Sequence, residues 1–127
     1  MGKINSFEDL EVWQVSHQLT LHLYKVTLSF PREEQFGITA QMRRAAVSIP
    51  NNIAEGFGRY TTKDFIHFLI QARGSTFELR YLILLSQDLG YLTNEVQIEL
   101  LKQVESIGKM LNAMINSLRK RLSPTNL

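Results

Sequence analysis

The chain has 127 residues, of which 44% are hydrophobic and 20% charged, the size and composition of one globular domain with a proper core. Fourteen basic and twelve acidic side chains give a formal net charge of +2, too small an excess to indicate nucleic acid by itself. The absence of cysteine excludes disulfides, thiolate nucleophiles and zinc–cysteine sites, and suits a cytoplasmic location. No apolar stretch is long enough to predict a signal peptide or a membrane span.

The first predicted helix runs from about Phe7 to Ser29. Ser6 can serve as its N-cap, and Pro31 prevents its continuation because the residue before a proline avoids helical geometry. Its apolar side chains fall on two lines, each at steps of three and four residues. A helix that is apolar on two sides needs more than one neighbour.

The second predicted helix, from about Thr39 to Glu55, contains Pro50 in its interior. An interior proline leaves the carbonyl of Ala46 without its helical donor and costs about 3 kcal/mol or more, so we expect a kink there. The bend could serve only tight packing, or it could direct Arg43, Arg44 and the following GFGRY turn toward a partner. Packing is the simpler interpretation, because kinks at proline are common without function.

The remaining helix ends are predicted from glycines and threonines. Gly56 and Gly58 are expected to end the second helix. The third helix is expected from Thr62 to Leu89, with Gly90 as the glycine that follows its end. The fourth is expected from Thr93 to Arg121, and its apolar residues follow the alternating spacing of packed helices.

Four helices with short connections predict an all-α, antiparallel, up-down-up-down four-helix bundle. We expect residues 1–127 to form a single domain, with a core at about 6–120 and a frayed tail at 122–127. The third helix also carries apolar residues that are interspersed with Arg73 and Arg80. A lone bundle would leave part of this surface exposed, which predicts self-association.

The sequence offers no catalytic constellation. Its histidines are His17, His22 and His67, and only the single pair Asp64 and His67 resembles half of a di-iron motif. His17 lies on an apolar line and is expected to be a hydrogen-bonded core or interface histidine. We therefore expect no enzymatic activity, no catalytic residue, no metal and no cofactor.

Basic residues are concentrated in the middle of the chain. The candidate nucleic-acid-binding residues are Arg43, Arg44, Arg59, Lys63 and Arg73. Arginine suits phosphate because its planar fork donates two parallel hydrogen bonds. The alternative is that these side chains pair with acidic groups within the chain or across a subunit boundary. A second basic cluster, 119–121, lies where the dipole of the fourth helix also favours cations.

Four stretches of the chain resemble a known family: FEDLEVWQ (7–14), FPREEQFGITAQMRRAAVSIPNNIAEGFGR (30–59), FIHFLIQARGSTFELRYLI (65–83) and LGYL (89–92). They are similar to the bacterial 23S rRNA intervening-sequence protein family, also called the S23 or four-helix-bundle protein family. The resemblance covers about residues 6–120 and implies a four-helix bundle that assembles as a ring-like pentamer. The chain is also similar to the accessory variability proteins of diversity-generating retroelements, which implies nucleic acid and a reverse transcriptase as partners.

Together these patterns predict a non-enzymatic homo-oligomer, a pentamer by resemblance, that associates with RNA or DNA through basic surface residues. A ribonucleoprotein setting in the cytoplasm, without a membrane partner, fits this hypothesis. The alternative is a protein–protein interaction scaffold with no nucleic-acid role. The resemblance provides no catalytic residues to carry over, so it indicates the fold more closely than the function.

Overall fold

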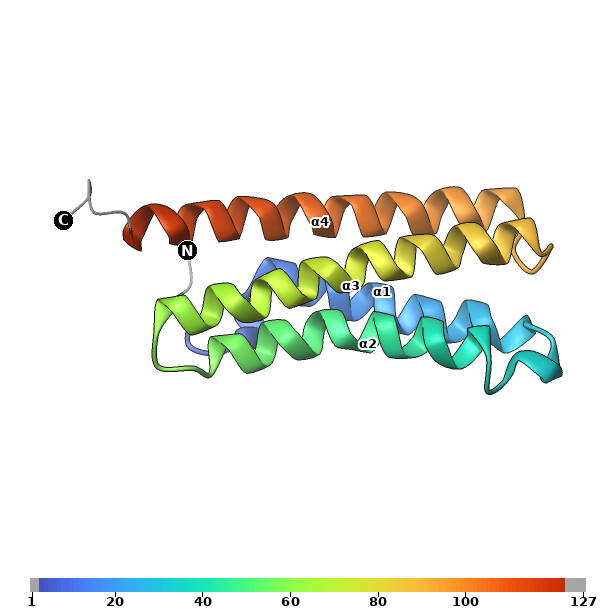
Figure 1. The fold of residues 1–127 in the computed structure, drawn as a ribbon, viewed down its shortest axis with the longest axis horizontal. Helices are drawn as coiled ribbons and strands as arrows, with labels where there is room; N and C mark the ends of the chain where they lie inside the picture. The colour runs from blue at the N-terminus through green and yellow to red at the C-terminus, as the bar shows by residue number, and fades with distance from the viewer. Residues whose placement is uncertain (1–2, 123–127) are drawn as a thin grey trace.

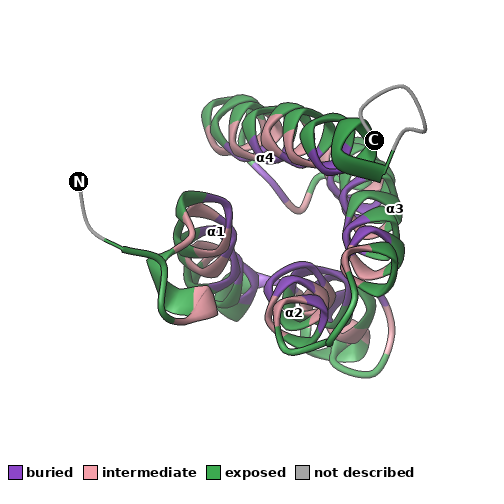
Figure 2. Ribbon diagram, turned by 90° about the vertical axis from the view of Figure 1, so that its left-hand side faces the viewer, coloured by how far each residue is buried: buried purple, intermediate pink, exposed green. Residues whose placement is uncertain are grey.

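The computed structural model describes residues 3–122, and every regular element in this range is helical. The four long helices are α1 (Glu11–Val26), α2 (Ile38–Phe57), α3 (Thr62–Asp88) and α4 (Asn94–Leu122). They lie side by side along the long axis of the molecule, joined at its two ends (Figure 1). Seen from one end, α2 lies between α1 and α3, and α3 lies between α2 and α4 (Figure 2). The prediction of an all-α four-helix fold is therefore confirmed.

The first predicted helix is wrong in its extent, because the chain forms three helical pieces over Phe7 to Ser29. A 3₁₀ turn at Phe7–Asp9 precedes α1, and a second turn at Thr27–Ser29 follows it. Ser6 caps the first turn, where its Oγ accepts from the backbone N–H of Glu8 at 3.1 Å. The extended backbone of Leu10 then separates this turn from α1. The capping signal in the sequence was real, but it marks a single turn.

The core is one apolar cluster to which all four helices contribute. Its most deeply buried large side chains are Leu19, Leu23, Met42, Ile49, Ile53, Leu69, Leu79, Ile83, Leu100, Ile107 and Leu111. Each such burial contributes roughly 1.5–3 kcal/mol before the entropy of ordering is counted. Helical spacing in the sequence places these residues on the inner faces, which is the reason for the helix pairing.

Gly56 lies inside α2 rather than at its end, which corrects the expectation from the sequence. The helix continues to Phe57, and Gly58 follows as its C-cap. A Cβ on Gly56 would lie 2.7 Å from the Cβ of Phe68 in α3. The glycine is therefore needed for the close approach of α2 and α3, and the exposed position after Phe57 ends the helix.

The connection between α3 and α4 is built as the sequence predicts. Gly90 has a positive φ of 81°, and the N–H of Tyr91 donates to the carbonyl of Ser86 at 2.9 Å. This is the Schellman ending that favours glycine. The hydroxyl of Tyr91 donates to Oε2 of Glu34 at 2.8 Å, which ties this connection to the one before α2. That hydrogen bond raises the pKa of Tyr91 above its ordinary value.

Pro50 is buried inside α2, and the helix runs through it without interruption. The carbonyl of Ala46 lacks its usual helical donor because proline has no N–H. In its place, Oγ1 of Thr20 from α1 lies 3.2 Å from that oxygen and 2.9 Å from the carbonyl of Ser16. A hydroxyl from the neighbouring helix therefore compensates for the proline. The predicted kink at Pro50 stays a prediction.

Two further expectations concern the chain ends and membranes. Leu122, the first residue of the predicted frayed tail, is the last residue of α4, and the rest of that tail lies outside the described residues. Within residues 3–122, none of the helices combines the length and the apolarity that crossing a bilayer requires.

We predict that Thr20→Val lowers the free energy of unfolding by about 1–3 kcal/mol, because it leaves the buried Ala46 carbonyl without this donor. Urea unfolding measures the change. Pro50→Ala restores an N–H to α2, so Thr20→Val should cost clearly less in that background. Equal costs in both backgrounds would contradict the assigned role, and Thr20→Ser serves as the control that keeps the hydroxyl.

Candidate nucleic-acid interface

The five basic residues predicted to bind nucleic acid do not converge on one surface. Arg43 faces α1, Arg44 lies on the exposed face of α2, and Arg73 lines a groove beside α4. Only Arg59 and Lys63 lie together, at the connection between α2 and α3. The structure therefore places the five residues on separate parts of the surface.

Arg43 is a structural residue that joins α2 to the end of α1. Its Nε donates to Oγ1 of Thr27 at 2.9 Å, and its Nη2 donates to the carbonyl of Tyr24 at 3.3 Å. The guanidinium also lies 4.6 Å from the centre of the Tyr24 ring. Carbonyls in the last turn of a helix lack helical donors and favour a cation. The Arg43 guanidinium provides both a donor and a positive charge there, and two of its five N–H groups are used within the chain.

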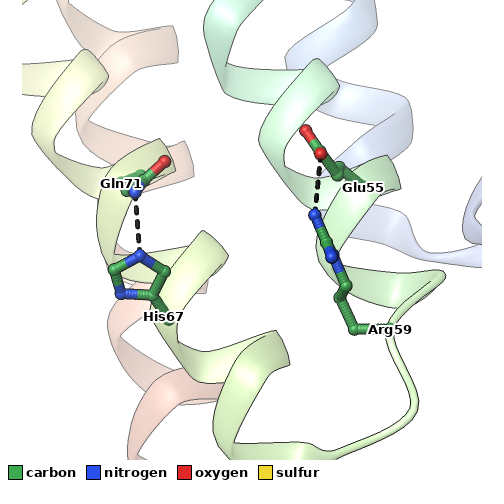
Figure 3. A network of polar contacts seen from close by, with 4 residues as sticks. All are labelled: Glu55, Arg59, His67 and Gln71. Carbon is green, nitrogen blue, oxygen red and sulfur yellow. Dashed lines mark hydrogen bonds and ion pairs between the residues drawn. The ribbon is translucent and has the colours of Figure 1, made fainter.

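Arg59 lies at the end of the molecule where α2 turns into α3. Its Nη2 is 3.0 Å from Oε1 of Glu55, and the two side chains are roughly half-exposed, at 46% and 50% (Figure 3). The guanidinium also lies 4.7 Å from the centre of the Phe68 ring. A surface ion pair of this kind contributes little to stability because water and salt screen it. Arg59 is therefore held in place without being buried.

Other cationic and aromatic groups share this end with Arg59. Lys63 is exposed in the first turn of α3, and Tyr60 in the connection is fully exposed. The last turn of α4 carries exposed Arg119 and Arg121 and reaches the same end of the molecule (Figure 1). We call Arg59, Tyr60, Lys63, Arg119 and Arg121 the basic end. Tyr60 is the last residue of the GFGRY turn that the sequence offered as a possible partner contact, but it was not among the candidate nucleic-acid-binding residues.

Acidic groups limit the field of the basic end. Glu55 pairs with Arg59, and Asp64 lies in the first turn of α3, where Thr61 accepts its backbone N–H. Glu8 and Asp9 precede α1, on the opposite side of the end view from α3 (Figure 2). The positive groups are therefore concentrated on the α3 and α4 side of this end.

Arg73 belongs to a different surface, a groove of about 290 Å³ between α3 and α4. Arg73, Arg80 and Lys109 line its rim, and Phe77, Val104 and Gly108 supply much of its apolar lining. The Arg73 guanidinium lies 5.7 Å from the centre of the exposed Phe77 ring. Lys109 is paired with Glu105 at 3.3 Å, which reduces the positive charge of the rim.

Each of the three histidines contacts a neighbouring side chain of the same chain. His17 stacks on Trp13 with a centroid separation of 5.0 Å, and Nδ1 of His22 lies 2.7 Å from Oε1 of Gln103. Nε2 of His67 lies 3.0 Å from Nε2 of Gln71, one turn further along α3 (Figure 3). Across residues 3–122, no three histidine, aspartate or glutamate side chains are grouped so that they could hold a metal ion.

The fold and these surfaces define a four-helix protein that has a basic end and several exposed apolar side chains. The chain belongs to the 23S rRNA-intervening sequence protein family, whose pattern it matches over residues 8–113. This confirms the family resemblance of the sequence.

One solved structure similar to this chain is a protein of unknown function from the S23 ribosomal protein family of Bacteroides thetaiotaomicron. It shares 25% sequence identity and a TM-score of 0.74, and the match covers 82% of this chain and 97% of that one. A search among curated proteins finds no match to the chain.

We predict that the two adjacent arginines of α2 differ in their effect on stability. Arg43→Ala should lower the free energy of unfolding by about 1–3 kcal/mol, because it removes charge-assisted hydrogen bonds to α1. Arg44→Ala, the matched control on the exposed face, should change it by less than about 0.5 kcal/mol. Chemical denaturation of both variants provides the measurement, and equal effects would contradict the assignment of Arg43 to structure.

Proposed function

We propose that the protein is a non-enzymatic, homo-oligomeric four-helix bundle that associates with RNA or DNA through its basic end. In this proposal the bundle has up-down-up-down topology, α2 bends at Pro50, and copies assemble as a ring of five, in a cytoplasmic ribonucleoprotein setting. Two contacts support an antiparallel arrangement of α1 and α2. Thr20 contacts Ala46, and Tyr24, which is later in α1, contacts Arg43, which is earlier in α2.

The observation that carries the nucleic-acid proposal is that several exposed cations and an exposed aromatic ring lie at one end of the molecule. Arg59 and Lys63 flank the fully exposed Tyr60 at the connection between α2 and α3, and the last turn of α4 brings Arg121 to the same end of the molecule. Basic groups follow a phosphate backbone, and exposed aromatic rings stack on unpaired bases. This combination favours single-stranded or looped nucleic acid over a rigid duplex.

Assembly of several copies would repeat the basic end around an axis. The net charge of one copy is only +2, so a single basic end is expected to bind weakly. Linking several weak sites raises the effective concentration at each one, which strengthens binding without any new contact. The family description refers to 23S rRNA intervening sequences, which agrees with an RNA setting but does not identify a ligand.

A second candidate function is a scaffold that binds another protein, such as a reverse transcriptase, without nucleic acid. The exposed apolar side chains of α1 and α3, among them Leu21 and Phe77, favour it. Capture of one specific protein after nuclease treatment, together with no RNA binding at low salt, would favour the scaffold.

We expect the full chain to bind a fluorescent RNA hairpin with a single-stranded extension, and to bind it far more weakly as salt rises from about 50 to 200 mM. Lys63→Ala combined with Arg121→Ala should weaken binding at low salt by roughly tenfold and flatten the salt dependence, because two phosphate contacts are removed. Fluorescence anisotropy measures both quantities.

Two variants serve as comparisons in the same assay. Arg44→Ala combined with Lys102→Ala removes the same charge from exposed positions on α2 and α4, and should leave binding within about twofold. Tyr60→Ala should weaken binding while leaving the salt slope unchanged, because stacking releases no counterions. No binding at low salt, or an equal loss in the control pair, would count against the basic end.

A further inference from the structure

We propose that the outer face of α3 is a helix-pairing seam, through which α3 helices of separate copies pack in parallel. The seam consists of Ile70, Gly74, Phe77, Tyr81 and Leu84. This inference rests on the self-association in the proposed function and assigns it a surface and an orientation.

The seam is exposed and has coiled-coil spacing. Its residues follow steps of four, three, four and three positions along α3. The exposed fractions are 39% for Ile70, 57% for Phe77, 61% for Tyr81 and 39% for Leu84. Apolar residues at this spacing form a continuous stripe on one side of a helix, and packed helices bury such stripes against each other. The stripe extends over about 22 Å of helix at 1.5 Å per residue.

The bundle already buries a different stripe of the same helix. Leu69, Leu79 and Ile83 point into the core and are fully buried. Between the two stripes, Ser75 on one side is 2.8 Å from Ser48 of α2, and Arg73 on the other side borders the groove beside α4. The seam therefore lies on the outer side of α3, and at Phe77 its edge reaches the groove beside α4 (Figure 2).

Gly74 supports an external partner. Glycine inside a helix costs roughly 1 kcal/mol relative to alanine, so it usually has a packing reason. For Gly56 that reason is the close contact with Phe68. A Cβ on Gly74 would meet no described heavy atom within 4 Å, so the single copy gives no reason for the glycine. At the centre of the seam, its missing side chain leaves room for a bulky residue of a partner.

The charges beside the seam are self-complementary in one orientation. Arg73 and Arg80 follow one edge of the seam, and Glu78 lies on the other. In a parallel pair, each flanking residue meets the residue five positions later on the opposite edge of the next helix, which places Arg73 against Glu78 of another copy. An antiparallel pair would bring the two arginine edges together. The charge pattern therefore selects a second copy of α3, in parallel.

The exposed apolar side chains of α1 are a weaker candidate for this role. Leu21 and Tyr24 of α1 and Leu28 of the turn after it are exposed, but residues 17–30 contain no acidic side chain that could pair with Lys25 of another copy. A parallel seam also suits cyclic symmetry, because helices around a common axis all run in the same direction. Arg73 would then be an interface residue rather than a ligand for nucleic acid.

Charge exchange tests the seam. Sedimentation equilibrium of the full chain over a range of concentrations should show association, and Arg73→Glu or Glu78→Arg alone should weaken it several-fold. The double variant, Arg73→Glu with Glu78→Arg, should restore association to within about twofold of the parent, because the pair is re-formed with its signs exchanged. The control is Glu99→Arg, a reversal at an exposed position of α4, which should have no effect.

Phe77→Glu provides a second variant that does not depend on the ion pair. The side chain is 57% exposed, so the single copy should stay folded by circular dichroism while association is lost. Single variants that associate like the parent, or a double variant that fails to recover, would overturn the seam. A parent chain that is monomeric at every concentration would overturn both the seam and the proposed self-association, whereas RNA binding in the anisotropy assay is judged separately.

Discussion

The outer face of α3 carries apolar side chains that its own bundle cannot bury, and this excess is the physical constraint on which the account depends. One side of the helix fills the core through Leu69, Leu79 and Ile83. Another side presents Phe77 and Tyr81 to solvent. In the proposed seam, this exposed apolar surface packs against the same surface of a second copy.

The remaining structure can be understood as support for that helix. α2 approaches α3 closely because Gly56 has no side chain to separate it from Phe68. α1 in turn stabilises α2, where Thr20 supplies a hydroxyl to the Ala46 carbonyl that Pro50 leaves without a donor. Arg43 joins the same two helices at the end of α1. Much of the distinctive polar chemistry of the second helix is therefore structural, and the candidate binding groups lie at the basic end.

Helix positions and helix ends could be predicted from the sequence wherever local chemistry decides them. Gly90 was placed correctly because a left-handed residue after a helix favours glycine. The length of the helical segment after Ser6 was not predicted correctly, because an N-cap residue looks the same in the sequence whether one helical turn or five turns follow it. Gly56 was misassigned for another reason: its role comes from Phe68, a contact between two helices that spacing alone does not contain.

For the candidate site, the sequence alone did not predict which basic side chains are exposed. Arg43 and Arg44 are neighbours in the sequence, yet a rotation of about 100° along the helix directs one to α1 and the other to solvent. Which of them is available depends on how α2 is turned in the bundle, and composition holds no signal for that. Arg59 and Lys63 were predicted together and lie together because a short turn joins them. That α4 ends with Arg121 at the same end of the molecule depends on the whole fold.

The most direct test of the proposed α3 seam is disulfide cross-linking, because the chain has no native cysteine that could form other disulfides. Leu84→Cys places a thiol on the outer side of α3, and Glu99→Cys places one on an exposed position of α4 as the reference. Under mild oxidation the account predicts rapid covalent linkage between identical positions for the α3 variant and little for the reference. Cross-linking that is no faster at position 84 than at position 99 would contradict it.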